Sequence, residues 1–370
     1  MSKVKLGEVA IEHKETCKGS KDGYPIVGLE HLIPEEVTLT AWNEDSENTF
    51  TKMFRKGNVL FGRRRAYLKK AAVAPFDGIC SGDITVIEAL PDRILPELLP
   101  FIIQNDDLFD FAVGKSAGSL SPRVKWEHLK NYEFELPDMD KQRELAELLW
   151  AMDATKKSYQ KLIAATDELV KSQFIEMFGK PGTDPYEWGL TTLGECCKLN
   201  PRRPKDMTPD IDYSFVAMPS VSEDGRIDAS IERPYSEVCK GFTYFAENDV
   251  LFAKITPCME NGKGGVAKGL KNGAGFGSTE FHVLRPIKGA SDPYWLYIIT
   301  MFPKFRSDAE KVMTGTGGQR RVPITYLSEY RIALPPIELQ EQFAAFVRQS
   351  DKSKYNASQV MRLIAQRRKL

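Results

Sequence analysis

The sequence of 370 residues lacks the features that mark membrane, secreted and metal-binding proteins. It holds no apolar run long enough to span a membrane, and its first residues lack the apolar segment of a signal peptide. Its six cysteines form no C-x-x-C pair, and its four histidines are scattered without metal-ligand spacing. We therefore expect a cytoplasmic protein without a disulfide framework, a metal site or a cofactor.

The sequence also has no excess of charge of either sign, because 51 Lys and Arg residues balance 51 Asp and Glu residues. A net charge of zero argues against indiscriminate binding to phosphate, so nucleic acid could only be held through local basic patches. The length of the chain exceeds what one core organises and suits two domains with connecting structure.

A long amphipathic segment fills the middle of the chain, from residue 138 to residue 179. Asp138 can cap its amino end, and no proline or glycine follows until Gly179. About forty helical residues would span roughly 60 Å, which exceeds the needs of one core and predicts a spacer. Positions at alternating steps of four and three predict a seam against another helix, and most of them are apolar or aromatic, namely Leu145, Leu149, Met152, Tyr159, Ile163 and Val170.

The sequence also repeats itself once. Residues 6–8 are matched by 193–195, residues 54–61 by 245–252, and residues 78–83 by 275–280. Residues 123–137 map onto 321–335 at an offset of 198, and this offset places the second seam at Phe343, Val347, Met361 and Ile364. We therefore predict a globular domain over 1–137, a helix over 138–179, a second domain over 180–336 and a second helix over 337–370. Since Leu370 aligns with Ser172, the second helix holds no counterpart of residues 174–179.

Each globular copy is expected to mix strands and helices. Short buried strands are predicted at 58–61 and 84–87 in the first copy, and at 249–252 and 281–284 in the second. Helical spacing covers 96–111 and 293–309, and each of these segments opens with a proline suited to a first turn. The fold class is therefore α+β.

This ordered duplication resembles the specificity (S) subunit of a type I restriction–modification system. The resemblance covers essentially the whole chain and depends on the paired Leu-Gly-Glu motifs, the paired strand turns and the Leu-Pro entries into the helices. It implies two similar mixed α/β target-recognition domains and two long antiparallel, coiled-coil-like helices related by a pseudo-twofold axis. Each domain is expected to read one half of a bipartite site in double-stranded DNA, and the helices are expected to fix the gap.

The resemblance also implies partners and the absence of catalysis. Two methyltransferase (modification) subunits are expected to dock on the helices, and restriction endonuclease subunits are expected to join through that complex. No cofactor is expected. Exposed apolar helix faces predict self-association of the isolated chain.

Two matched sets of polar residues are candidates for DNA contact, because Arg and Lys suit phosphates and Arg or Gln can pair with base edges. The alternative interpretation is that these charges only solvate the surface. The candidates in the first copy are Arg63, Arg64, Arg65, Lys69, Lys115, Ser119 and Arg123. Those in the second copy are Lys254, Thr256, Lys263, Gln319, Arg320 and Arg321.

Two other classes of function stay open. Gly114-Lys115-Ser116 ends like a phosphate-binding loop, but Phe109 stands where the first glycine is needed. Asn200-Pro201-Arg202-Arg203 begins like an amino-methyltransferase motif but lacks its second proline and aromatic residue. A DNA methyltransferase or nuclease with an unfamiliar motif remains an alternative, as does an adaptor that binds only proteins.

Overall fold

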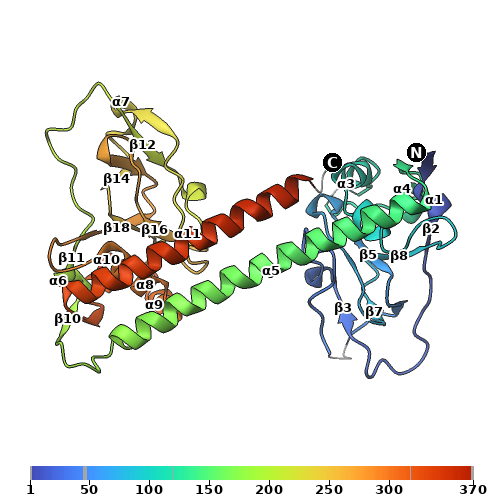
Figure 1. Ribbon diagram of the computed structural model, residues 1–370, viewed down its shortest axis with the longest axis horizontal. Helices are drawn as coiled ribbons and strands as arrows, with labels where there is room; N and C mark the ends of the chain where they lie inside the picture. The colour runs from blue at the N-terminus through green and yellow to red at the C-terminus, as the bar shows by residue number, and fades with distance from the viewer. Residues whose placement is uncertain (1, 45–47, 119, 317, 368–370) are drawn as a thin grey trace. The chain divides into compact units, whose positions relative to one another are not determined.

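The computed structural model describes residues 2–44, 48–118, 120–316 and 318–367, and it divides into two compact units. Unit 1 holds the chain up to Gln160 together with the segment from Ser358 onward, and unit 2 holds Lys161–Ala357. Each unit mixes helices and strands (Figure 1). Within these described ranges, no helix is long and apolar enough to cross a membrane.

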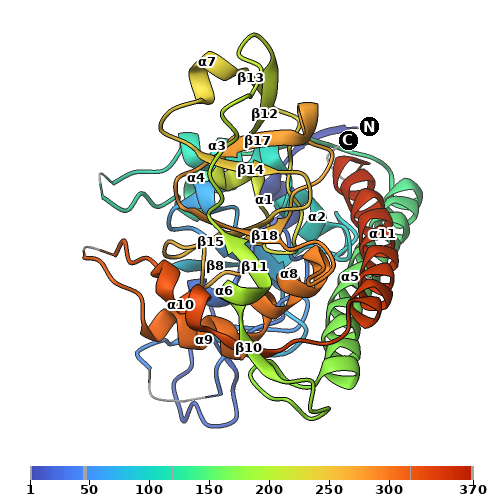
Figure 2. The ribbon, with the colours of Figure 1, turned by 90° about the vertical axis from the view of Figure 1, so that its left-hand side faces the viewer.

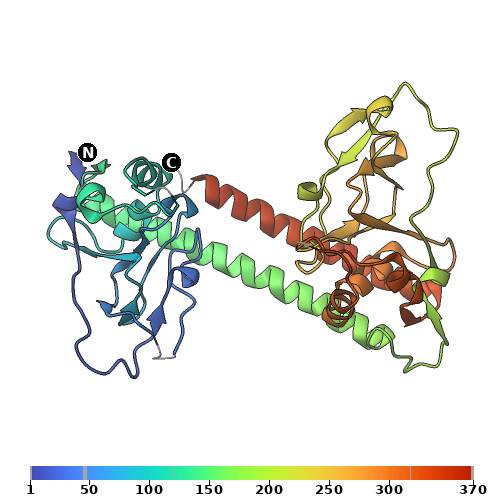
Figure 3. The ribbon, with the colours of Figure 1, turned by 180° about the vertical axis from the view of Figure 1, so that it is seen from behind.

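Unit 1 is built on two small sheets and a strand pair. The sheets have the orders β2-β8-β5-β6 and β3-β7-β4, and β1 pairs with β9. Figure 3 shows the blue strands of this unit from behind. Its strands are β1 (Ser2–Lys5), β2 (Ala10–Glu12), β3 (Ile26–Val27), β4 (Lys52–Phe54), β5 (Val59–Gly62), β6 (Ala71–Val73), β7 (Gly78–Cys80), β8 (Ile84–Ala89) and β9 (Glu133–Leu136). Its helices are α1 (Leu6–Val9), α2 (Leu99–Ile103), α3 (Asp106–Gly114) and α4 (Trp126–Leu129), with 3-10 turns at Leu29–His31 and Ala66–Leu68.

Unit 2 repeats this plan and adds one edge strand. Its sheets have the orders β11-β18-β15-β16 and β13-β12-β17-β14, and β10 pairs with β19 (Figure 2). Its strands are β10 (Leu190–Thr192), β11 (Cys197–Leu199), β12 (Asp212–Val216), β13 (Glu232–Pro234), β14 (Thr243–Ala246), β15 (Val250–Ala253), β16 (Gly264–Val266), β17 (Ala274–Gly277), β18 (Phe281–Pro286) and β19 (Arg331–Ala333). Its helices are α6 (Leu193–Cys196), α7 (Tyr235–Val238), α8 (Pro293–Met301), α9 (Pro303–Lys311) and α10 (Ile324–Glu329), with 3-10 turns at Met218–Ser220 and Lys271–Gly273.

The internal repeat predicted from the sequence is therefore confirmed at the level of topology. In unit 1, β7 pairs in parallel with β3 and antiparallel with β4, and in unit 2, β17 pairs in parallel with β12 and antiparallel with β14. The four strands predicted from short apolar runs are β5, β8, β15 and β18, which lie at the centres of their sheets and are mostly buried. The α+β fold class is confirmed with them.

The turn before the central strand shows how the sequence produces the same local structure twice. The side chain of Asn58 accepts a hydrogen bond from the backbone N–H of Arg55 at 2.8 Å, and that of Asp249 accepts one from Ala246 at 2.7 Å. Asn58 and Asp249 are 5% and 1% exposed, so in each turn a buried side chain makes the hydrogen bond that stabilises the turn. Asp249 carries a charge, and Arg285 neutralises it with two hydrogen bonds of 2.8 and 2.7 Å.

A buried glutamine fixes the start of each long helix. Gln142 accepts a hydrogen bond from the backbone N–H of Leu95 at 2.8 Å and donates one to the carbonyl of Pro137 at 2.9 Å. Gln340 repeats this arrangement with Asp292 at 2.9 Å and Pro335 at 2.8 Å. The offset of 198 residues relates Gln142 to Gln340, and their shared role identifies Leu95 and Asp292 as equivalent positions.

The two long helices are α5 (Met139–Phe178) and α11 (Ile337–Arg367) (Figure 1). In unit 2 they run antiparallel, because Phe174 and Phe178 contact Phe343 while Asp167 pairs with Lys354 at 3.0 Å. Residues 368–370 of the predicted second helix lie outside the described residues.

The predicted seam positions have different surroundings in the two units. Val170, Phe343 and Val347 share one buried cluster of unit 2. Leu145 and Leu149 instead pack against the core of unit 1, and Tyr159, Ile163 and Met361 are half-buried. The pairing of the helices beyond these contacts stays a prediction.

Two predicted helical segments were wrong in their extent. Residues 96–111 form two helices rather than one, because Asn105 caps the amino end of α3 by accepting from the N–H of Asp107. Residues 293–309 are likewise divided into α8 and α9, since Pro303 has no N–H to continue a helix and starts a new one.

Candidate functional site

Two of the predicted basic segments of unit 1 lie together in the structure. Residues 63–65 follow the end of β5, and Arg123 forms antiparallel bridges both with Arg64 and with Ala117. The N–H of Arg65 donates to the carbonyl of Pro122 at 2.8 Å. Two segments separated by about sixty residues of sequence therefore form one surface, which we call loop cluster 1 (Arg63, Arg64, Arg65, Ala117 and Arg123).

One carboxylate holds loop cluster 1 together. Asp83 accepts hydrogen bonds from Arg123 Nε at 2.7 Å and from Arg64 Nη1 at 3.3 Å. The hydrogen bond from Arg123 is the main cause that lowers the pKa of Asp83 below its usual range. Since Arg64 and Arg123 are occupied in this way, we interpret them as residues that position the cluster.

Arg63 and Arg65 carry positive charges that Asp83 does not neutralise, because Asp83 pairs with Arg64 and Arg123. Arg63 has a buried Nε with no hydrogen-bond partner among the described residues. Arg65 is exposed and has a φ of 54°, in the left-handed region that non-glycine residues seldom adopt. The exposed Tyr67 follows two residues later. The exposed side chains of Arg65 and Tyr67 are available to an external anion or base.

The remaining candidates of unit 1 are less available. Lys69 forms an ion pair with Asp106 at 2.6 Å. Lys115 is exposed at the end of α3 and lies 5.8 Å from the ring centroid of Phe111. Ser119 lies outside the described residues.

Unit 2 repeats the arrangement with other side chains. Arg321 forms antiparallel bridges with Ile255 and Thr314, and its guanidinium donates to Glu280 at 2.9 and 2.8 Å. The hydrogen bond from Arg321 is the main cause that lowers the pKa of Glu280. We call this surface loop cluster 2 (Lys254, Ile255, Thr256, Thr314, Gln319, Arg320 and Arg321).

Backbone hydrogen bonds align the two clusters residue by residue. The N–H of Arg63 donates to the carbonyl of Asp83, and that of Lys254 donates to the carbonyl of Glu280. The N–H of Thr256 donates to the carbonyl of Arg320, as that of Arg65 does to Pro122. Lys254 therefore occupies the position of Arg63, and Thr256 that of Arg65.

The other candidates of unit 2 differ in how free they are. Thr256 donates its hydroxyl to the carbonyl of Gly318, and Arg320 lies 3.6 Å from Glu310. Lys263 is half-buried and reaches the carbonyl of Met218 at 3.4 Å. Gln319 is exposed, and its side chain makes no hydrogen bond to another described residue.

The two carboxylates were missed as site residues, although a signal for them was present. The sequence repeat already matched residues 78–83 with 275–280, which aligns Asp83 with Glu280. An acidic residue at equivalent ends of two repeats, each followed by a matched arginine, was enough to suggest an ion pair. Within the described part of the chain, no group of three or more His, Cys, Asp and Glu residues is placed to hold a metal ion.

Comparison with known proteins identifies the class to which this duplicated architecture belongs. A family model described as the type I restriction modification DNA specificity domain matches residues 1–165 and 185–359, one segment for each repeat. The chain belongs to this family.

Two relatives from Escherichia coli support the assignment to the specificity-domain family. The specificity subunit of the type I restriction enzyme EcoEI is 42% identical over 160 residues, covering 42% of this chain and 26% of that subunit. The specificity subunit of EcoAI is 39% identical over 166 residues, covering 44% of this chain and 28% of that subunit. The matched part thus spans about a quarter of the length of these relatives.

A solved structure agrees with the fold of this specificity-domain protein. The crystal structure of the S subunit of a type I restriction–modification system from M. genitalium matches with a TM-score of 0.56. It shares 12% sequence identity, and the match covers 100% of this chain and 95% of that chain. At this level of identity the likeness concerns the fold.

Proposed function

We propose that this chain is the DNA-recognition subunit of a type I restriction–modification system. Each unit would read one half of a bipartite DNA site through its loop cluster. The chain itself would direct the reaction to a sequence, and partner subunits would carry out methylation and cleavage.

The observation that carries this proposal is the recurrence of one loop arrangement in both units. In each, a segment after the central strand is joined to a second segment by an arginine–carboxylate pair. Side chains that read bases are usually carried by loops held on a rigid sheet, because the sheet fixes the position of the loops relative to the DNA. Membership of the specificity-domain family supports the same conclusion.

The two clusters would read different sequences. Loop cluster 1 offers the guanidinium groups of Arg63 and Arg65, which suit phosphates and the acceptor edge of guanine. At the equivalent positions loop cluster 2 offers Lys254 and Thr256, together with the amide of Gln319, which suits adenine. We therefore expect an asymmetric site with unrelated halves.

The long helix α5 offers a surface for the modification subunits. Leu148, Leu162 and Leu169 are 57%, 50% and 53% exposed, and they are separated by multiples of seven residues. Apolar side chains at heptad spacing lie along one helix face, which is the arrangement that a partner helix recognises. Two modification subunits would dock in this way, and restriction subunits would join through them.

The proposal is tested by DNA binding with modification subunits present. Arg65→Asn removes the charge and keeps a residue that tolerates the left-handed backbone. If Arg65 contacts a phosphate, affinity should fall similarly on all sequences and the salt dependence should weaken by about one unit of slope. If Arg65 contacts a base, affinity should fall by about 1–3 kcal/mol on the cognate site only.

Arg93→Gln provides the control, because Arg93 is an exposed arginine of unit 1 that lies outside loop cluster 1. Binding measured by gel shift at two salt concentrations should be unchanged in this variant. If Arg65→Asn and the wild-type chain bind DNA equally, loop cluster 1 is not part of the recognition surface. Failure of the complete complex to prefer any methylation site in the host genome would refute the proposed function itself.

A further inference from the structure

A guanidinium group is buried in the core of unit 2 without a carboxylate partner among the described residues. It belongs to Arg306, which lies in α9 and is 8% exposed. Its Cζ lies 5.1 Å from the ring centroid of Phe252 in the central strand β15. Burial of a charge is costly unless hydrogen bonds compensate for it, so the five N–H donors of this side chain require other acceptors.

Backbone carbonyls take the place of the carboxylate. Nε of Arg306 donates to the carbonyl of Thr300, in α8, at 2.8 Å. Its Nη1 donates to the carbonyl of Met259, and its Nη2 to that of Gly262 at 3.3 Å. Met259 and Gly262 belong to the segment 254–263, which joins β15 to β16. One buried side chain therefore attaches this segment to the two helices α8 and α9.

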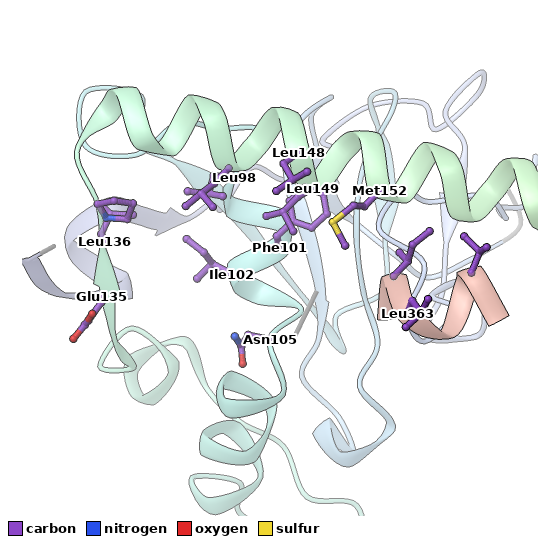
Figure 4. Close-up of a pocket in the computed structure, with 14 residues that line it drawn as sticks. Leu98, Phe101, Ile102, Asn105, Glu135, Leu136, Leu148, Leu149, Met152 and Leu363 are labelled. Carbon is purple, nitrogen blue, oxygen red and sulfur yellow. The ribbon is translucent and has the colours of Figure 1, made fainter. Parts of the chain in front are cut away.

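Unit 1 has a phenylalanine at the position of Arg306. Helices α3 and α9 are each nine residues long, and Phe109 and Arg306 are each the fourth residue. Figure 4, a close-up of an apolar pocket in unit 1, includes Asn105 at the turn that leads from α2 into α3. The ring of Phe109 stacks on that of Phe61 at 5.5 Å, and Phe61 has the same place in β5 as Phe252 has in β15. Equivalent sites thus hold an apolar ring in one unit and a hydrogen-bond donor in the other.

The segments between the corresponding strands also differ in length. In unit 1 the eight residues 63–70 join β5 to β6, whereas in unit 2 the ten residues 254–263 join β15 to β16. The longer segment folds back on itself, because the N–H of Met259 donates to the carbonyl of Ile255 at 2.9 Å and that of Lys263 donates to the carbonyl of Cys258 at 3.0 Å. A longer segment loses more conformational entropy when it is ordered, so an additional attachment is needed to hold it in one conformation.

This segment carries part of loop cluster 2. The hydroxyl of Thr256 donates to the carbonyl of Gly318 and accepts from the backbone N–H of Arg320 at 3.1 Å. A carboxylate oxygen of Glu260 lies 3.9 Å from Nη2 of Arg320. A displacement of the segment would therefore move both Thr256 and the guanidinium of Arg320.

We propose that Arg306 is a positioning residue for DNA recognition by unit 2. Its hydrogen bonds to the carbonyls of Met259 and Gly262 hold segment 254–263 in the conformation that presents loop cluster 2. Because Arg306 is buried, it acts through this segment and touches neither base nor phosphate. The inference rests on the proposed function, since it assigns a role within the recognition surface of unit 2. Recognition by unit 1 is independent of such a residue, because Phe109 has no group that donates a hydrogen bond.

Arg306→Phe is the variant that tests this inference, because unit 1 accommodates a phenylalanine at the equivalent position. The change removes the donors and leaves the carbonyls of Met259 and Gly262 unpaired. Hydrogen–deuterium exchange of the full chain should become at least about tenfold faster at the N–H groups of Met259 and Lys263. Exchange in residues 63–70 of unit 1 should be unchanged. This measurement does not involve DNA.

The second measurement is discrimination between DNA sites by the complex with modification subunits. The affinity for the cognate site is compared with the affinities for sites that carry one changed base pair in either half. Arg306→Phe should reduce this ratio at least about fivefold for changes in one half and leave the ratio for the other half as in the wild type. A purely structural role of Arg306 would instead lower the fraction of folded chain and weaken binding to all sites by one factor.

Two further variants accompany Arg306→Phe. Lys304→Gln is the matched control on the same helix, because Lys304 is exposed and pairs with Asp308 at 2.7 Å. It should equal the wild type in both measurements. Arg306→Lys keeps the positive charge but lacks the planar group that reaches two carbonyls. It should change both measurements in the same direction by a smaller factor, and it replaces Arg306→Phe if circular dichroism shows that the latter does not fold.

Two results would overturn the inference and leave the proposed function intact. One is wild-type exchange at Met259 and Lys263 in folded Arg306→Phe. The other is faster exchange with the discrimination in both halves either retained or lowered by the same factor. A wild-type complex that discriminates in neither half would overturn the proposed function, and the inference with it.

Discussion

At the scale of single residues, a buried histidine supports the base of loop cluster 2. His282 lies in β18, and its Nε2 donates to the carbonyl of Val322 at 2.9 Å. Its Nδ1 accepts from the amide of Asn200 at 3.2 Å, which fixes the neutral tautomer because a carbonyl can only accept. Burial lowers the pKa of His282 to about 4. A second proton would have to bind to Nδ1, where it would face the hydrogens of the Asn200 amide.

The depressed pKa predicts that unit 2 loses stability in mild acid. Between pH 6.5 and pH 4 the unfolded chain binds a proton at residue 282 that the folded chain does not, so unfolding is favoured as the pH falls. The wild-type free energy of unfolding should fall by about 2 kcal/mol between pH 7 and pH 5 through this residue. Urea unfolding of His282→Gln should not show this decrease in the free energy of unfolding between the two pH values.

His128→Gln is the control for this measurement, because His128 is exposed on the short helix α4. It should retain the full wild-type difference between the two pH values. An identical pH dependence in His282→Gln and the wild-type chain would show that His282 protonates freely in the folded state.

Residue roles were only partly predictable from the sequence. The repeat located both basic segments in each unit, because matched motifs survive at fixed offsets. It did not reveal that Arg64 and Arg123 are occupied by Asp83, since such a contact depends on how two turns fold back over the sheet. The seam prediction also missed Phe174, because packing against the unit 2 core, rather than strict heptad spacing, decides which face of α5 is buried there.

At the scale of elements, each long helix is attached to its domain by one glutamine rather than by apolar packing alone. The side chain of Gln142 is 2% exposed and satisfies one backbone donor and one backbone acceptor. Buried polar groups without partners are costly, so this attachment specifies where α5 begins relative to α2.

Removal of this attachment should be strongly destabilising. Gln142→Ala leaves the N–H of Leu95 and the carbonyl of Pro137 unpaired, at a cost of about 2–4 kcal/mol in the free energy of unfolding. Gln340→Ala should have an effect of similar size in unit 2. Gln342→Ala, on an exposed face of α11, should change the stability by less than about 0.5 kcal/mol. Denaturant titrations that gave the same midpoint for Gln142→Ala and Gln342→Ala would contradict this interpretation.

The element boundaries show where sequence reasoning was limited. Central strands and the two long helices were found because their apolar patterns are continuous. The α2 and α3 pair was read as one helix because the capping role of Asn105 competes with a helical pattern that continues across it.

At the scale of the whole molecule, α5 is shared by the two units, with Met139–Gln160 in unit 1 and the rest in unit 2. A helix resists bending more than a loop, so its length is expected to set the separation of the two half-sites in DNA. An insertion of four residues near Lys161 adds about one turn, or about 5.4 Å. The gap in the methylated site should grow by about one or two base pairs.

Single-molecule sequencing of methylated host DNA measures this gap directly. A four-residue insertion beside Gly19, in an exposed turn of unit 1, should leave both half-sites and the gap as they are. An unchanged gap in the α5 variant, with methylation retained, would exclude the helix as the determinant of spacing.

The turn formed by Asn58 in one copy and Asp249 in the other constrains how a duplicated protein can change over time. Asp249 is tolerated in the interior because Arg285 accompanies it, and the strand position equivalent to Arg285 in unit 1 is Glu88. Glu88 accepts a hydrogen bond from His13 at 2.7 Å and cannot donate to a carboxylate, so an aspartate at position 58 would lack the arginine that accompanies Asp249. If Asn was the ancestral residue, acquiring the arginine before the change to Asp would have avoided a buried carboxylate without a partner.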